Sequence, residues 1–241
     1  MAFISGNPVI AGLDLYSSSS TPMHEIGQLI YGDNGKAFRY VKAGAANLVV
    51  GNVLQAPVID TQFDSMSVPV NAVGSQTVTI TNGTTALTGD EFKGGSLSVS
   101  VTPGLGEEYT IIGNGAAISG ASLTVYLDRP IRTAWTTSTK VTLRNLWNGV
   151  IQCPTTLTGS VAGVAIHAIT ALYYGWIQTK GVAAVLSDNS TGAVGSDVGV
   201  PGATAGAVGV NVAGTGKCNT VGRALRALST GLCVPVYLNI D

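Results

Sequence analysis

The chain has 241 residues, of which 45% are apolar and 10% are charged, and its formal net charge is −1. This length allows one large domain or two smaller ones. The 12 basic residues are scattered singly, so the chain lacks the positive patch that binding to nucleic-acid phosphates requires. Glycine, Val, Thr and Ile are abundant and helix formers are scarce, which favours short strands and tight turns.

The cysteines and the N-terminal sequence bear on the cellular compartment. Cys153, Cys218 and Cys233 lie far apart, and this odd number without metal-ligand spacing argues against a disulfide framework and a zinc site. We expect buried, apolar thiols in a reducing compartment. No secretory signal pattern and no apolar segment long enough to span a membrane is recognisable, so we expect synthesis and folding in a cytoplasm.

Residues 1–24 are predicted to form an extended N-terminal arm. Clusters of Gly, Pro and Ser punctuate this segment, as is typical of irregular chain. Its apolar side chains are nevertheless too many for a free tail in water. They are the candidate residues for contact with another subunit or a larger surface: Phe3, Ile4, Val9, Ile10, Leu13, Leu15 and Tyr16. The alternative is a first strand followed by an irregular turn.

A hairpin signal follows the arm. Asp33-Asn34-Gly35 lies between the stretches 28–31 and 36–41, and Asn and Gly tolerate the positive φ of tight hairpin turns. Phe38, Tyr40 and Lys42 alternate onto one face, as in a half-buried strand. Residues 45–55 are predicted to form a further strand with a kink at Gly51, or a short helical turn.

Residues 58–139 are predicted to form a small inserted β-sandwich or barrel. Short Thr- and Ser-rich strands recur there at intervals of about ten residues, with glycine-containing turns between them. The expected strands are 77–81, 96–102, 109–112 and 123–127. The neighbouring carboxylates Asp90-Glu91 and Glu107-Glu108 are interpreted as solvated loops, because consecutive strand residues point to opposite faces.

Residues 140–241 supply further expected strands at 141–144, 161–169, 197–200, 207–212, 221–225 and 234–240. The central stretch, 172–186, reads LYYGWIQTKGVAAVL, with two apolar runs on either side of the polar break 178–181. This pattern predicts a hairpin at the core of a C-terminal barrel. His167 has no Ser, Cys or carboxylate at a recognisable spacing, and we interpret it as a hydrogen-bonded structural histidine on a strand.

The sequence contains none of the common catalytic motifs. We find no Gly-x-Ser-x-Gly nucleophile motif, no phosphate-binding loop of the Gly-x-x-x-x-Gly-Lys-Ser/Thr type and no dinucleotide-binding glycine pattern. We therefore identify no catalytic residue, no cofactor site and no metal site, and expect a protein that is not an enzyme.

Together these patterns predict an all-β protein. Its body is a β-barrel or sandwich formed by residues 25–57 and 140–241. A second, small β-domain of residues 58–139 is inserted between the N- and C-terminal parts of that body. The extended arm of residues 1–24 precedes it.

Several short stretches resemble the head decoration (cement) proteins of tailed bacteriophages. They are DNGKAFRYVKAG at 33–44, NGV at 148–150, YGWIQTKG at 174–181, VGRAL at 221–225 and VYLNI at 236–240. The resemblance implies a β-rich, often trimeric protein without catalytic residues that sits between capsomers. Its implied partners are the shell of the major capsid protein and further copies of itself, with no nucleic acid or membrane. The implied location is the capsid surface of the virion, after synthesis in the host cytoplasm.

A capsid decoration role is physically plausible, and binding of host glycans is the alternative. Many symmetric, individually weak contacts can hold a shell together, and an arm that orders on docking can add backbone pairing to a strand edge. The alternative is a phage fibre or adsorption module that binds host-surface glycans. Such a module needs exposed aromatic rings, and we expect most of the available ones to be buried: Trp135, Trp147, Tyr173, Tyr174 and Trp176.

Overall fold

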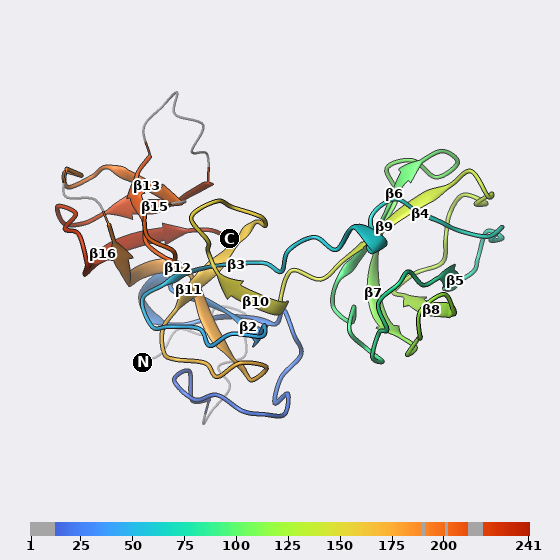
Figure 1. Ribbon diagram of the computed structural model, residues 1–241, viewed down its shortest axis with the longest axis horizontal. Helices are drawn as coiled ribbons and strands as arrows, with labels where there is room; N and C mark the ends of the chain where they lie inside the picture. Colours follow the sequence, from blue (N-terminus) through green and yellow to red (C-terminus); the bar gives the residue numbers. More distant parts are fainter. Residues whose placement is uncertain (1–12, 189–190, 201, 212–218) are drawn as a thin grey trace, which may run out of the picture. The chain divides into compact units, whose positions relative to one another are not determined.

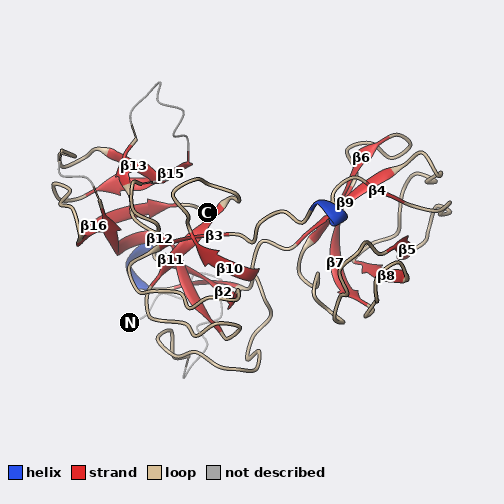
Figure 2. Ribbon diagram, viewed as in Figure 1, coloured by secondary structure: helices blue, strands red, loops and turns tan. Residues whose placement is uncertain are grey.

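A computed structural model describes residues 13–188, 191–200, 202–211 and 219–241 (Figure 1). Within this part of the chain there are sixteen strands and two short 3-10 helices, and strands make up most of the ordered structure (Figure 2). The prediction of an all-β fold is confirmed. The chain divides into two compact units, one comprising the described residues up to Pro57 and from Leu146 onward, the other Val58–Asn145.

The first unit begins with the predicted hairpin. β1 (Leu29–Tyr31) pairs antiparallel with β2 (Ala37–Ala43) across the 3-10 turn Asp33–Gly35. Asn34 and Gly35 have φ values of 58° and 71°, which few residue types other than Asn and Gly adopt readily. The turn sequence therefore determines the position of this hairpin.

Five strands of the first unit close into a ring. Their pairings are antiparallel except for a parallel pair between the first two, and a pairing of the last strand with the first completes the ring. In ring order they are β2, β10 (Asn148–Gln152), β3 (Val53–Gln55), β11 (Val161–Ala165) and β12 (Tyr174–Ser187). Val41, Leu54, Val150 and Ile177 belong to one buried apolar cluster inside this ring.

A second ring is built on the other half of β12. The strand order continues through β16 (Leu232–Asn239), β15 (Asn219–Ala224), β13 (Asp197–Val200) and β14 (Gly209–Val210). A parallel bridge between Ser187 and Val208 returns the ring to the end of β12. A separate buried cluster fills it and includes Val185, Val198, Val221 and Val236. β12 is therefore a member of both rings.

The predicted hairpin at 172–186 is wrong, because β12 is one continuous strand of 14 residues. At the polar break the register shifts between Gln178 and Lys180, and Gly181 has a φ of 83°, so the strand bends through a bulge instead of reversing. The buried Gln178 side chain donates hydrogen bonds to the carbonyls of Lys180 and Val182, at 2.9 and 3.0 Å. The polar residues thus satisfy the backbone of the bulge.

The second unit is a six-stranded antiparallel sheet with a core that includes Tyr109, Trp135 and Leu143. Its strands alternate exposed Thr or Ser with buried apolar residues, as in Thr77–Thr81. In sheet order the strands are β4 (Met66–Ser67), β9 (Lys140–Arg144), β6 (Ser96–Val101), β7 (Glu108–Asn114), β8 (Ser122–Leu127) and β5 (Thr77–Thr81).

The inserted unit is longer than predicted at its C-terminal end. β9 pairs with β4 and β6, and its residues Val141 and Leu143 are buried in the core of this unit. The sequence predicts residues 140–144 as part of the body, because the turn at 128–130 resembles the end of the insertion. The unit ends at Asn145 rather than at residue 139.

Candidate functional site

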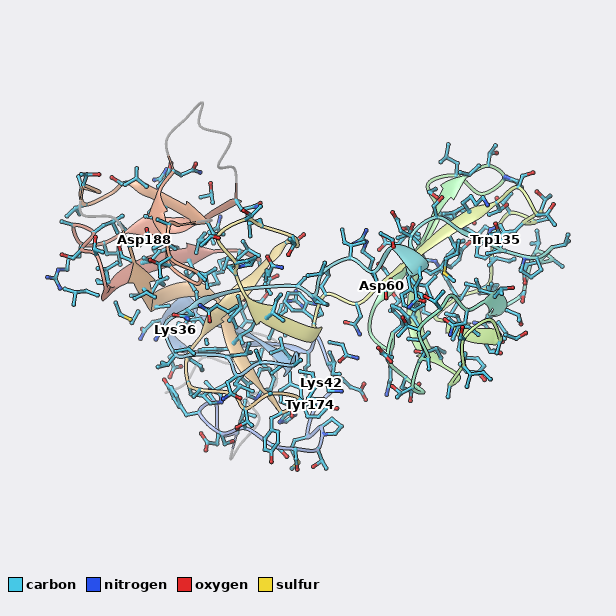
Figure 3. The ribbon with its side chains drawn as sticks, viewed as in Figure 1. Lys36, Lys42, Asp60, Trp135, Tyr174 and Asp188 are labelled. Atoms are coloured by element: carbon cyan, nitrogen blue, oxygen red, sulfur yellow. The ribbon has the colours of Figure 1, made fainter. Side chains whose placement is uncertain are left out.

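Aromatic side chains line the outer face of the β2–β12 pair. Tyr40 lies opposite Trp176 in the strand register, and their ring centres are 5.1 Å apart. Tyr174 stacks on Tyr40 at 6.2 Å, and the Lys42 ammonium lies 5.6 Å from the centre of the Tyr174 ring (Figure 3). Because Val41 and Ile177 point into the ring interior, these aromatic residues occupy the opposite face, which needs a separate cover.

The described part of the N-terminal arm covers this face. Leu13 and Leu15 are half-buried and pack against the aromatic cluster. Ser19 and Tyr174 exchange two backbone hydrogen bonds, of 3.0 and 2.8 Å, and the amide of Met23 donates to the Tyr40 hydroxyl at 3.0 Å. The described part of the arm is therefore docked on its own body by a short backbone bridge, the hydrogen bond of Met23, two leucines and the ring of His24.

The predicted contact residues fall into three groups. Leu13 and Leu15 are engaged with the body of their own chain, whereas the Tyr16 side chain is 67% exposed. The other predicted residues, Phe3, Ile4, Val9 and Ile10, lie outside the described residues.

Both histidines of the chain lie where the arm meets the body. The His24 ring is 5.1 Å from Tyr40 and 5.2 Å from Trp176. His167 follows the end of β11, so its expected place on a strand is wrong. Its ring is partly buried and lies beside the backbone of Ser17 in the arm. Burial lowers the pKa of His167, while the backbone of Ser17 and the charge of Asp14 act in the opposite direction.

A cavity of about 240 Å³ lies between the arm and the aromatic face. Trp176, Tyr174 and Leu13 give it apolar walls, and Asp14, Ser17 and His24 are among the polar residues that line it. Pockets for drug-sized ligands usually exceed about 300 Å³. This cavity lies just below that range.

The aromatic residues that glycan binding would need are mostly covered. Trp135 and Trp176 are only 0% and 2% exposed, as expected for core residues. The Arg39 guanidinium lies 4.8 Å from the centre of the Trp147 ring and covers it. Tyr174 is half-buried in the aromatic stack, which leaves Tyr173, 37% exposed, as the most accessible ring of the five.

One carboxylate of the second unit departs from its expected place in a solvated loop. Glu107 is 8% exposed, and it accepts hydrogen bonds from the Tyr109 hydroxyl at 2.5 Å and the Thr133 hydroxyl at 2.6 Å. Burial acts to raise the pKa of Glu107, but Thr133, Tyr109, Trp135 and the charge of Arg132 outweigh it, so the pKa is lowered. An ionised carboxylate with its acceptors occupied by structural donors is suited to holding this unit together.

The sequence contained a signal for this buried carboxylate. Glu107 and Tyr109 are two residues apart and therefore share one face of the extended chain, together with the buried Ile111. The prediction of a solvated loop considered the neighbours Glu107 and Glu108, which face opposite ways. It did not consider the alternation of Glu107, Tyr109 and Ile111.

The cysteines differ among themselves. Cys153 is buried, and burial raises the pKa of its thiol to about 12, which makes it unreactive at neutral pH. Cys233 is exposed on β16, so the expectation of a buried thiol is wrong there. Cys218 lies outside the described residues.

No group of three or more His, Cys, Asp or Glu side chains within the described ranges could hold a metal ion. Nor does that part of the chain contain a helix long and apolar enough to cross a membrane. Comparison of the sequence with protein-family models and with curated proteins, and of the fold with solved structures, found no match. Function must therefore be inferred from the residues of this chain.

Proposed function

We propose that the protein is a capsid decoration (cement) protein of a tailed bacteriophage. It is a structural protein of the virion, without catalytic activity, that binds the outer surface of the head shell as a trimer and stabilises it. The observation that carries this proposal is the apolar arm, whose described part is held to the body by few contacts. They are two leucines, a bridge at Ser19, the hydrogen bond of Met23 and the ring of His24 against Tyr40 and Trp176.

An arm attached in this way can leave the body of its own chain and bind a shell subunit instead. The backbone groups that Ser19 presents to Tyr174 are those that a strand edge of a shell subunit would use. Tyr16 and, ahead of it in the sequence, Phe3, Ile4, Val9 and Ile10 supply the apolar side chains for that contact. Each copy needs only modest affinity, because many copies bind a symmetric shell at once.

The body supports the same proposal. Two closed rings that share β12 make a stiff platform for an arm, and the sparse charge of the chain is compatible with close contact between subunits. Of the five aromatic residues singled out for glycan binding, only Tyr173 is clearly exposed, so glycan binding is the weaker alternative.

Binding to purified, empty head shells tests the proposal. Wild-type protein is expected to co-sediment with shells and to raise their thermal denaturation temperature, and a variant lacking residues 2–12 is expected to do neither. Tyr126→Ala, which alters an exposed tyrosine of the second unit, is the matched control and should behave as wild type. The proposal fails if wild-type protein leaves shells unbound and their thermal stability unchanged.

A further inference from the structure

The outer face of β12, β16 and the end of β15 carries an unusual set of exposed side chains. Val182 lies opposite Tyr237, Ala184 lies opposite Pro235, and the amide of Leu225 donates to the Pro235 carbonyl at 2.9 Å. Since side chains alternate between faces along a strand, these residues share one face. We call this set the apolar face, comprising Val182, Ala184, Leu225, Cys233, Pro235 and Tyr237.

The apolar face departs from the pattern of a sheet with one side in water. Val182, Tyr237 and Leu225 are 41%, 44% and 47% exposed, although the opposite side of the same strands already packs in the second ring. In the second unit the corresponding outward positions of β5 are Thr77, Thr79 and Thr81. Strands that are apolar on both sides are typical of sheets covered on both sides. The sequence of β12 and β16 therefore indicates a cover over this face.

The residues around the apolar face are polar and indicate which kind of partner covers it. Arg223 lies next to Tyr237 in the register and forms a 2.9 Å ion pair with Asp197, and both side chains are more than half exposed. Lys180 and Asn239 lie opposite each other at the end of the apolar rows. An apolar centre with a polar rim is the usual anatomy of a subunit interface.

The charges favour a second copy over an acidic or basic partner. Arg223 and Asp197 neutralise each other, so this part of the rim carries no net charge that would repel an identical face. When two such faces meet, Arg223 of one copy can also pair with Asp197 of the next, which makes the rim self-complementary. A basic partner would repel Arg223, and an acidic partner would repel Asp197.

We propose that copies of this chain associate through the apolar face, which they turn toward a common symmetry axis. The inference rests on the self-association included in the proposed function, and it names the surface responsible. In an oligomer with closed rotational symmetry, the apolar face of every copy is covered by a neighbouring copy.

Oligomeric mass in solution tests the surface without any shell. By light scattering coupled to size-exclusion chromatography, wild-type protein is expected to be oligomeric. Val182→Glu should be monomeric at the same concentration, because association would bury its charge. Thr79→Glu places the same charge on the outward face of β5 and should keep the wild-type mass, and circular dichroism should show all three proteins folded. A monomeric wild type, or a Val182→Glu variant with wild-type mass, overturns the inference.

Cys233 supplies a second measurement on the same face. In a Cys218→Ser background, a maleimide should label Cys233 slowly in the oligomer and at least tenfold faster in the Val182→Glu monomer, whereas the buried Cys153 stays unlabelled. Equal labelling rates overturn the inference. The inference is also overturned if the wild type is a monomer and deletion of residues 2–12 alone speeds the labelling of Cys233. The arm of the same chain would then cover the apolar face.

The two proposals can fail separately. A monomeric protein whose Cys233 becomes protected only on shells would show that this face binds the shell, which overturns the inference and keeps the decoration role. An oligomer that Val182→Glu dissociates but that leaves shells unbound would keep the inference and remove the decoration role.

Discussion

The hydroxyl of Tyr40 accepts a hydrogen bond of 3.0 Å from the amide of Met23 and so ties the end of the arm to the aromatic face. Burial raises the pKa of Tyr40, which keeps its hydroxyl protonated at neutral pH, although the bond from Met23 lowers that pKa somewhat. Tyr40 also contacts His24, Tyr174 and Trp176. One side chain of β2 thus connects the arm to the first ring.

Replacing Tyr40 by Phe removes this hydrogen bond and keeps the ring. We expect docking of the arm to weaken by about 0.5–1.5 kcal/mol, the usual net value of one hydrogen bond. Hydrogen exchange followed by mass spectrometry should show faster exchange in residues 13–24, with the β12 and β16 amides unchanged. Tyr126→Phe, at an exposed position, is the control. Unchanged exchange in the arm would show that the hydrogen bond is dispensable for docking.

Docking of the arm is expected to depend on pH through His167. Because burial lowers the pKa of His167 in the docked state, the undocked state binds the proton more readily. Docking should therefore be strongest above the ordinary pKa of 6.5 and weaken as the pH falls through that value, with Asp14 moderating the loss. Exchange rates of residues 13–19, corrected for intrinsic pH dependence, measure this effect. His167→Phe should abolish the pH dependence, and an equal dependence in that variant would assign it to another group.

The bulge in β12 is expected to need glycine at position 181. Its φ is 83°, and an added Cβ would lie 3.1 Å from the Lys36 Cα and 3.2 Å from the Gly35 carbonyl oxygen. Gly35→Ala is the matched control, since Gly35 also has a positive φ but open space around it. We expect the control to cost about 1 kcal/mol of unfolding free energy from backbone strain alone, and Gly181→Ala more than about 2 kcal/mol. Urea denaturation measures both, and equal losses would contradict the crowding at Gly181.

Glu107 is expected to make the stability of the second unit sensitive to acid. Since the folded-state pKa of Glu107 is lowered, its contribution is present above the ordinary value of 4.5 and is lost as the pH falls through the folded-state pKa. Glu107→Gln replaces one acceptor oxygen by a donor that faces a hydroxyl, and should cost about 1–3 kcal/mol at neutral pH. Calorimetry of both proteins between neutral and acid pH should show the difference shrinking as the pH falls. A constant difference would exclude ionised Glu107 as the cause.

Local sequence patterns predicted the parts of the fold that depend on local chemistry. Asn34 and Gly35 set the β1–β2 turn by themselves, and alternation alone predicted β5 at Thr77–Thr81 with its inward and outward residues. Local patterns could not predict that β12 continues through its polar break at 178–181 instead of turning back. It depends on the Gln178 amide reaching the carbonyls of Lys180 and Val182, and on β2 and β16 pairing with the two halves of the strand.

The candidate site was predicted only in part, for a similar reason. Leu13, Leu15 and Tyr16 were singled out because a free tail would not carry them, and the structure gives the two leucines an apolar surface. That surface is made by β2 and β12, which are more than a hundred residues apart in the sequence. No local pattern joins Tyr40 to Trp176, His24 to these two rings, or His167 to the arm.

The sharing of β12 between the two rings has a consequence for unfolding. Because β12 is a strand of both rings, opening of either ring is expected to destabilise the other ring and the apolar cluster inside it. The first unit should consequently melt in a single cooperative transition, despite having two separate cores.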